Sequence, residues 1–322
     1  GMMVLISLML ISFITGGYGA FSIALLAVFG LLSYVLCYHF LKDVKGNSYR
    51  IKFFRTAIYY YLLSSLATWF LAGVILTVGK SDLYYNTVYF YLHFLYNGYF
   101  VFVLFGLLLN VIEAKGIELP LRFLKPFFIY LNMACIPTYF LSVLWSGVGS
   151  TYYVIAFGGA LLQSIALYFL WRVITRLRAR LNWSVISRTL FYFATIAFSI
   201  KIILQLLTAL PYFVNISVAL KPYFIIGYLH LFTLGFMSVA LLLLLYQIRF
   251  LELRKKIPLL GTLLFLLGVT GSEIIIFLQV SLYLFKMNSI SSYYELVFGL
   301  SAVIVLVILL LFVTQFQLKK LG

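Results

Sequence analysis

The chain has 322 residues, of which 65% are hydrophobic and 9% charged, and its formal net charge is +16. A soluble globular domain is about half apolar and a quarter charged, so this composition excludes a soluble domain and indicates a polytopic membrane protein. The positive charge does not indicate a nucleic-acid partner, because the lysines and arginines are spread over several short loops between apolar segments.

The apolar segments have the length of membrane-spanning helices, which need about 20 residues to cross roughly 30 Å of hydrocarbon. Spanning β-strands are excluded because residues 223–247 are apolar on every side, whereas a barrel strand alternates apolar and polar residues. We therefore predict an all-α bundle of about ten transmembrane helices in a single integral membrane domain, residues 1–322. The predicted helices cover residues 3–15, 20–40, 56–78, 87–111, 123–145, 152–171, 189–212, 223–247, 258–281 and 294–317.

The basic residues follow the even-numbered predicted helices, as in residues 42–55, 115–125, 172–188 and 249–256. Cytoplasmic loops carry an excess of lysine and arginine. The even-numbered helices are therefore expected to run from outside to inside, with both termini of the chain in the cytoplasm. Contact with anionic lipid headgroups is enough to explain these loops, so the lipid bilayer is the expected partner and nucleic acid is not.

Two of the three histidines lie in similar motifs inside predicted helices: YLHFLYNGYF, residues 91–100, and YLHLFTLGF, residues 228–236. Each motif has Tyr and Leu directly before the histidine, glycine five residues after it and an aromatic residue next. The two helices run in the same direction, and each histidine lies about two turns from the outer end. His93 and His230 are thus expected at the same depth, and a parallel repeat of helix pairs is one explanation.

Two further ionisable residues fall in the middle of predicted helices, Lys201 and Glu273. Gln205 lies one turn after Lys201 and shares its face. Charged groups in the hydrocarbon are costly and normally face the bundle interior with a partner. Lys201 and Glu273 can pair with each other or with backbone carbonyls and lock the bundle, or they can relay protons or substrate with Gln205.

The histidines allow two interpretations as well. An interhelical hydrogen bond is the simpler one. The other is haem or metal ligation, since neutral imidazole is the commonest protein ligand of metals and two helices presenting it at one depth could hold an iron. Asn97, one turn after His93, is suited to orient such a ligand.

Three stretches, YLHFLYNGYF, SIKIILQLLTALP and YLHLFTLGF, resemble distant relatives of the haem-copper oxidase large subunit, a superfamily of cytochrome oxidases, nitric oxide reductases and NnrS-type proteins. The resemblance implies twelve helices, with histidines on the second, sixth, seventh and tenth that hold two haems and a copper or non-haem iron. If two N-terminal helices are missing here, His93 matches the metal-ligand helix and His230 a haem-ligand helix.

The resemblance also has departures. Residues 123–145, which match the seventh helix, contain no histidine, and Lys201 lies on the ninth helix by this count, although its surroundings resemble the proton-channel lysine on the eighth helix of cytochrome oxidases. A complete oxygen-reducing site cannot be built from these residues. The resemblance implies a bacterial inner-membrane protein with His93 and His230 as haem ligands, His93 also as a copper or iron ligand, and an electron donor or other membrane subunits as partners.

Our leading hypothesis is a haem-copper-oxidase-like protein with a respiratory or nitric-oxide-related redox role. The alternatives are a proton-coupled transporter or channel that uses Lys201, Gln205 and Glu273, and a non-catalytic membrane scaffold. Hydrolases and nucleotide-driven pumps are disfavoured, because the sequence has no GxSxG, HExxH or phosphate-binding glycine loop. Whether the protein is an enzyme is left open by the sequence.

Overall fold

The computed structural model describes residues 2–17 and 19–319. Every regular element in these two ranges is helical, which confirms the predicted all-α architecture. The chain forms two compact units, Gly1–Gly106 (unit 1) and Leu107–Gly322 (unit 2). The organisation of residues 1–322 as a single domain stays a prediction.

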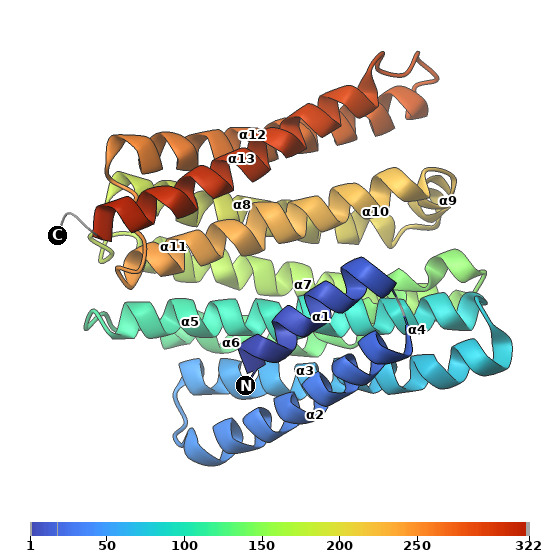
Figure 1. Cartoon of the computed structure of the whole chain (residues 1–322), viewed down its shortest axis with the longest axis horizontal. Helices are drawn as coiled ribbons and strands as arrows, with labels where there is room; N and C mark the ends of the chain where they lie inside the picture. Colours follow the sequence, from blue (N-terminus) through green and yellow to red (C-terminus); the bar gives the residue numbers. More distant parts are fainter. Residues whose placement is uncertain (1, 18, 320–322) are drawn as a thin grey trace. The chain divides into compact units, whose positions relative to one another are not determined.

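Unit 1 is organised around the long helix α3, which packs against α2, α4 and η1 (Figure 1). Ser48 caps α3 by accepting a hydrogen bond from the backbone N–H of Ile51, as a serine before a helix commonly does. The hydroxyl of Tyr34 on α2 donates to Ser65 Oγ on α3 at 2.8 Å. The elements of this unit are α1 (Met2–Gly16), α2 (Ala20–Asp43), α3 (Tyr49–Val78), α4 (Asp82–His93), the π-helical η1 (Phe94–Phe100) and α5 (Val101–Glu113), which continues into unit 2.

Unit 2 contains two closely packed helix pairs, α6 with α7 and α12 with α13 (Figure 1). The elements α10, η4 and α11 follow one another without a break and form one continuous helix. This helix packs against α8 and also against α12, so η4 contacts both of them. The elements are α6 (Leu121–Cys135), η2 (Pro137–Ser142), η3 (Leu144–Ser146), α7 (Ser150–Leu177), α8 (Val185–Thr208), α9 (Pro211–Ala219), α10 (Lys221–His230), the π-helical η4 (Leu231–Ser238), α11 (Val239–Gln247), α12 (Lys256–Leu284) and α13 (Tyr293–Lys319).

Eight helices in the described parts of the chain are long and apolar enough to cross a membrane. The first predicted span is the shorter apolar helix Met2–Gly16, and the fifth is divided, because α6 ends at Cys135 and Pro137 begins a 3-10 turn. Proline lacks the N–H that continues an α-helix. The fold is that of a multi-pass membrane protein, and the count of ten spans stays a prediction.

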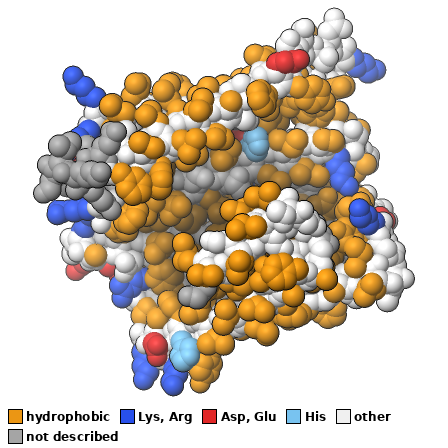
Figure 2. Space-filling model, in the orientation of Figure 1, with side chains coloured by type: hydrophobic (Ala, Val, Ile, Leu, Met, Phe, Trp, Pro, Cys, Tyr) orange, Lys and Arg blue, Asp and Glu red, His pale blue; other side chains and the backbone are white. Residues whose placement is uncertain are grey.

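Hydrophobic side chains predominate on the face of the molecule shown in Figure 2. Large apolar side chains such as Leu76 and Phe70 are 86% and 68% exposed. A soluble protein rarely exposes broad apolar surface of this kind. These side chains therefore contact lipid, which confirms the bilayer as a partner.

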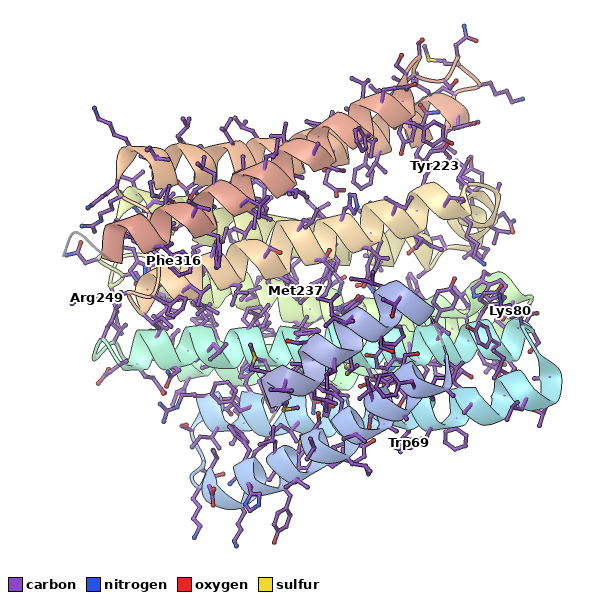
Figure 3. The ribbon with its side chains drawn as sticks, viewed as in Figure 1. Trp69, Lys80, Tyr223, Met237, Arg249 and Phe316 are labelled. Atoms are coloured by element: carbon purple, nitrogen blue, oxygen red, sulfur yellow. The ribbon has the colours of Figure 1, made fainter. Side chains whose placement is uncertain are left out.

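Aromatic rings gather where the start of α10, the end of α12 and the start of α13 meet. The ring of Tyr223 lies 5.8 Å from that of Tyr283 and 5.5 Å from that of Tyr293 (Figure 3). Tyrosine is enriched at membrane–water interfaces, where its ring is apolar and its hydroxyl meets water. The cluster has the composition expected of an interfacial anchor.

Polar groups at the opposite end of unit 2 are hydrogen-bonded to one another. The Lys115 ammonium donates to Gln247 Oε1, and Gln247 Nε2 donates to Ser187 Oγ at 2.7 Å. Burial lowers the pKa of Lys115 below its ordinary value, because desolvation disfavours the charged form. These bonds connect the segment after α5 with the end of α11 and the start of α8.

Candidate functional site

Both motif histidines occupy the same place in their helices. His93 is the last residue of α4 and is followed by the π-helical η1, and His230 is the last residue of α10 and is followed by the π-helical η4. A π-helical turn inserts an extra residue into the helix and is found frequently at functional sites. The sequence motif therefore has a structural counterpart that the sequence analysis did not predict.

The glycine of each motif packs against the helix that precedes it in its unit. A Cβ atom on Gly98 would lie 2.5 Å from Tyr60 Cβ on α3, and one on Gly235 would lie 3.2 Å from Ala197 Cβ on α8. In each pair the glycine follows its partner by the same number of residues. The ring contacts next to them match too, with centroids 5.4 Å apart for Tyr61–Tyr99 and 4.7 Å apart for Phe198–Phe236.

These equivalent contacts support the predicted repeat of helix pairs. In unit 1 the pair is α3 with the α4–η1–α5 helix, and in unit 2 it is α8 with the α10–η4–α11 helix. The two pairs share the same register at the histidine, at the glycine and at the aromatic contact. This structural match supports the repeat more strongly than the five matching residues of the motif do.

His93 is buried in unit 1, with 4% of its surface exposed. Its Nδ1 lies 3.4 Å from Nδ2 of Asn97, which is also buried, and its ring meets the Phe94 ring edge-on at 5.1 Å. The expected placement of Asn97 beside His93 is thus observed. An imidazole with an amide beside it can serve as a hydrogen-bond partner or as an oriented ligand.

His230 lies in unit 2 at the end of α10, which packs against α12. A Cβ on Gly227 would lie 3.1 Å from Ile276 Cγ2, and one on Gly235 would lie 4.0 Å from Val269 Cγ1. The two helices are therefore antiparallel, and His230 falls between these two contacts. Its Nδ1 is buried and has no hydrogen-bond partner among the described residues.

Glu273 lies on the face of α12 that packs against α10 and η4. Val269, Glu273 and Ile276 are spaced by four and three residues, which places them on one side of the helix. Glu273 thus lies between the same two contacts that enclose His230, at the same depth. It is 8% exposed, and both carboxylate oxygens are buried without a hydrogen-bond partner in residues 2–17 and 19–319.

Lys201 lies on α8, which also packs against η4. It is completely buried, and its Nζ lies 5.4 Å from the ring centroid of Phe198 and 5.7 Å from that of Phe232, which follows His230 by two residues. Ala197, Lys201 and Gln205 share one face by steps of four. Neither oxygen of Glu273 accepts a hydrogen bond from any described residue, so a direct Lys201–Glu273 hydrogen bond is not formed among them.

We call Lys201, Gln205, His230 and Glu273 the polar layer of unit 2. The helix that carries η4 packs against both α8, which carries Lys201 and Gln205, and α12, which carries Glu273. A Cβ on Gly235 would lie within 4.0 Å of both Ala197 on α8 and Val269 on α12, so the two helices meet beside η4. Gln205 Oε1 is buried and, like Glu273, finds no hydrogen-bond partner within the described ranges. The layer combines an amine, an imidazole and a carboxyl group at membrane depth, with several of their polar atoms unsatisfied.

Sequence reasoning also missed a buried amide whose oxygen is unsatisfied. Gln163 on α7 is 4% exposed, and its Oε1 has no partner in the part of the chain that the structure describes. The sequence signal that could have identified Gln163 is the presence of a glutamine inside an otherwise apolar segment. It belongs to unit 2, as the polar layer does.

A metal centre is not assembled by the described side chains, since no group of three or more histidine, cysteine, aspartate or glutamate residues among them is close enough to hold an ion. His93 belongs to unit 1 and His230 to unit 2. No family model, no curated protein and no solved structure matches the chain.

Proposed function

We propose that unit 2 carries a proton-transferring site of a multi-pass membrane transporter or channel, with Glu273 as the central acid–base group. The observation that supports this is the pair of buried, unpartnered oxygens on Glu273, at the depth of the unpartnered Nδ1 of His230. Ionisable residues at membrane depth mark ion pathways and proton relays. Structural carboxylates in such places are paired instead.

Proton exchange explains why Glu273 carries no partner. A fixed hydrogen bond to a donor would favour the ionised carboxylate and hold it in one state. An unpartnered carboxyl group can take a proton from one neighbour or water molecule and give it to another. His230 is the imidazole at the same depth, and imidazole accepts protons in the physiological pH range.

Lys201 on α8 contributes a basic group to the same layer. Its contacts with the rings of Phe198 and Phe232 stabilise a cation in the absence of water, because the face of an aromatic ring is electronegative. Gln205 extends the same face of α8 by one turn.

Proton flux into sealed proteoliposomes tests this function. A pH-sensitive dye inside the vesicles and a potassium diffusion potential would report flux through the wild-type protein, and Glu273→Gln is expected to abolish it. Glu295→Gln is the matched control, because Glu295 is exposed at the start of α13. Infrared difference spectra over pH should show a carboxyl band that Glu273→Gln removes. A wild-type protein without flux and without that band would overturn the proposal.

A second candidate function is haem binding in a haem-copper-oxidase-like protein, with a respiratory or nitric-oxide-related redox role. The equivalent positions of His93 and His230 before their π-helical segments support a shared role. The free Nδ1 of His230 fits one axial ligand of a haem, whose iron would supply one-electron chemistry. A copper or non-haem iron held by three such ligands does not fit the described residues.

The optical spectrum of the purified protein, oxidised and dithionite-reduced, distinguishes the two candidates. A Soret band that shifts on reduction and weakens in His93→Leu or His230→Leu would favour haem binding, and metal analysis of the same sample would report copper or iron. A colourless, metal-free protein from cells supplied with haem would exclude that candidate. An electron donor or further membrane subunits are expected as partners only if the protein binds haem.

The orientation is proposed from the basic loops. We place the loops at residues 42–55, 115–125, 172–188 and 249–256 in the cytoplasm. Both ends of this chain then lie on the cytoplasmic side of a bacterial inner membrane. Labelling of single cysteines from outside intact cells tests this. Lys80→Cys is expected to be labelled and Arg178→Cys protected.

A further inference from the structure

Three arginines of unit 2 surround one aromatic ring where α6 begins and α7 ends. The guanidinium carbons of Arg172, Arg122 and Arg176 lie 5.0, 5.6 and 5.9 Å from the ring centroid of Phe123. We call Arg122, Arg172 and Arg176 the arginine cluster. Arg172 and Arg176 are one turn apart on α7, and the close packing of α6 on α7 brings Arg122 to them.

The positive charge of the arginine cluster is not neutralised within the protein. In the described ranges, no carboxylate pairs with any of the three guanidinium groups, and the one hydrogen bond that Arg172 donates goes to the Tyr168 hydroxyl at 3.5 Å. Arg122 and Arg176 are exposed and Arg172 is half-buried, so their remaining donors are accessible. Like charges at this spacing repel one another unless an anion lies between them.

An exposed apolar stripe leads along α7 to the arginine cluster. Leu161, Ile165 and Tyr168 precede Arg172 by steps of four and three residues and share its face of the helix. They are 42%, 40% and 55% exposed. The surface is therefore apolar at membrane depth and strongly basic at the helix end, where the phosphates of lipid headgroups lie.

We propose that the arginine cluster binds the phosphate of an anionic phospholipid, whose acyl chain lies along Leu161, Ile165 and Tyr168. Guanidinium groups recognise phosphate through paired N–H donors, and basic pockets between transmembrane helices bind anionic headgroups. A free phosphate ion would use the same arginines but not the apolar stripe. The site is separate from the polar layer.

Lipid binding by native mass spectrometry tests the proposal with phosphatidylglycerol, phosphatidylcholine and inorganic phosphate as probes. The wild-type protein is expected to retain phosphatidylglycerol in preference to phosphatidylcholine. Arg172→Gln with Arg176→Gln should weaken retention by about fivefold for each arginine removed. The matched control is Arg178→Gln with Arg180→Gln, which removes the same charge from exposed positions directly after α7.

The outcomes separate the possible ligands. Equal losses in the cluster variant and the control variant would overturn the proposal, since general charge attraction would then explain binding. Full displacement of the lipid by inorganic phosphate, or equal retention of phosphatidylcholine, would overturn it as well. If the double variant does not fold, Arg176→Gln alone replaces it in the comparison with the wild-type protein, because it changes a single exposed side chain.

Discussion

Gly98 and Tyr60 are packed so closely that a Cβ atom on Gly98 would lie 2.5 Å from Tyr60 Cβ, a separation that real Cβ atoms do not tolerate. The contact joins η1 to α3 five residues after His93. Small residues allow membrane helices to approach closely, and dispersion contacts between them drive helix association. Gly98 is thus part of the packing that holds the His93 segment in place.

Gly98→Ala is expected to destabilise the protein by about 1–3 kcal/mol, the usual cost of overpacking a well-packed core. The atom that the new methyl group meets is a Cβ next to the backbone of α3, which cannot move aside as the end of a flexible side chain can. Thermal unfolding in detergent measures the change. Gly73→Ala is the control on α3, because a Cβ there meets nothing within 4 Å. Equal stability of the two variants would contradict the packing described for η1.

Gly235→Ala is expected to cost less than Gly98→Ala, although the two glycines are equivalent in the motif. The new methyl group would lie 3.2 Å from Ala197 Cβ and 3.6 Å from Leu231 Cδ1, so a shift of a few tenths of an ångström relieves it. Gly158→Ala, with open space around it, is the control in unit 2. The unfolding temperature is therefore expected to be highest for Gly158→Ala, lower for Gly235→Ala and lowest for Gly98→Ala.

The helices and the buried polar residues follow from patterns that the sequence contains. Apolar length predicts most of the spans, and burial of Lys201, Glu273 and Asn97 is expected from their places within those spans. The helical spacing of Arg172 and Arg176 already indicates that α7 extends past the membrane-spanning segment. These features depend on local composition and on the cost of exposing backbone and charge to lipid.

The arrangement of the site depends on which helices are neighbours, and no periodicity in this chain carries that information. Lys201 on α8 and Glu273 on α12 belong to one layer because η4 packs against both helices. The π-helical turns after His93 and His230 have no hydropathy signature, since they change the hydrogen-bond register rather than the residue types. The arginine cluster likewise requires α6 to place Phe123 beside α7.

Glu273→Leu is expected to leave the protein as stable as the wild type or more stable, while it abolishes proton flux. A buried carboxylate without a partner costs free energy when ionised, and replacing buried ionic groups by apolar ones of similar volume is often neutral or stabilising by about 1–4 kcal/mol. Thermal unfolding of the variant, with flux measured on the same preparation, checks both parts. Ile276→Ala on the same face serves as the control for packing and should destabilise by about 2–5 kcal/mol. A strong loss of stability in Glu273→Leu would indicate a structural role for the carboxylate.

The contact of the Lys201 ammonium with the Phe232 ring predicts a measurable coupling between α8 and η4. Phe232→Leu should destabilise the protein through lost packing and through the lost cation–π contact, which contributes about 0.5–2 kcal/mol. In a Lys201→Met background only the packing part remains, so the same substitution should cost less by that amount. The double-mutant cycle, measured by unfolding in detergent, isolates the difference. A coupling energy near zero would show that Phe232 packs beside Lys201 without stabilising its charge.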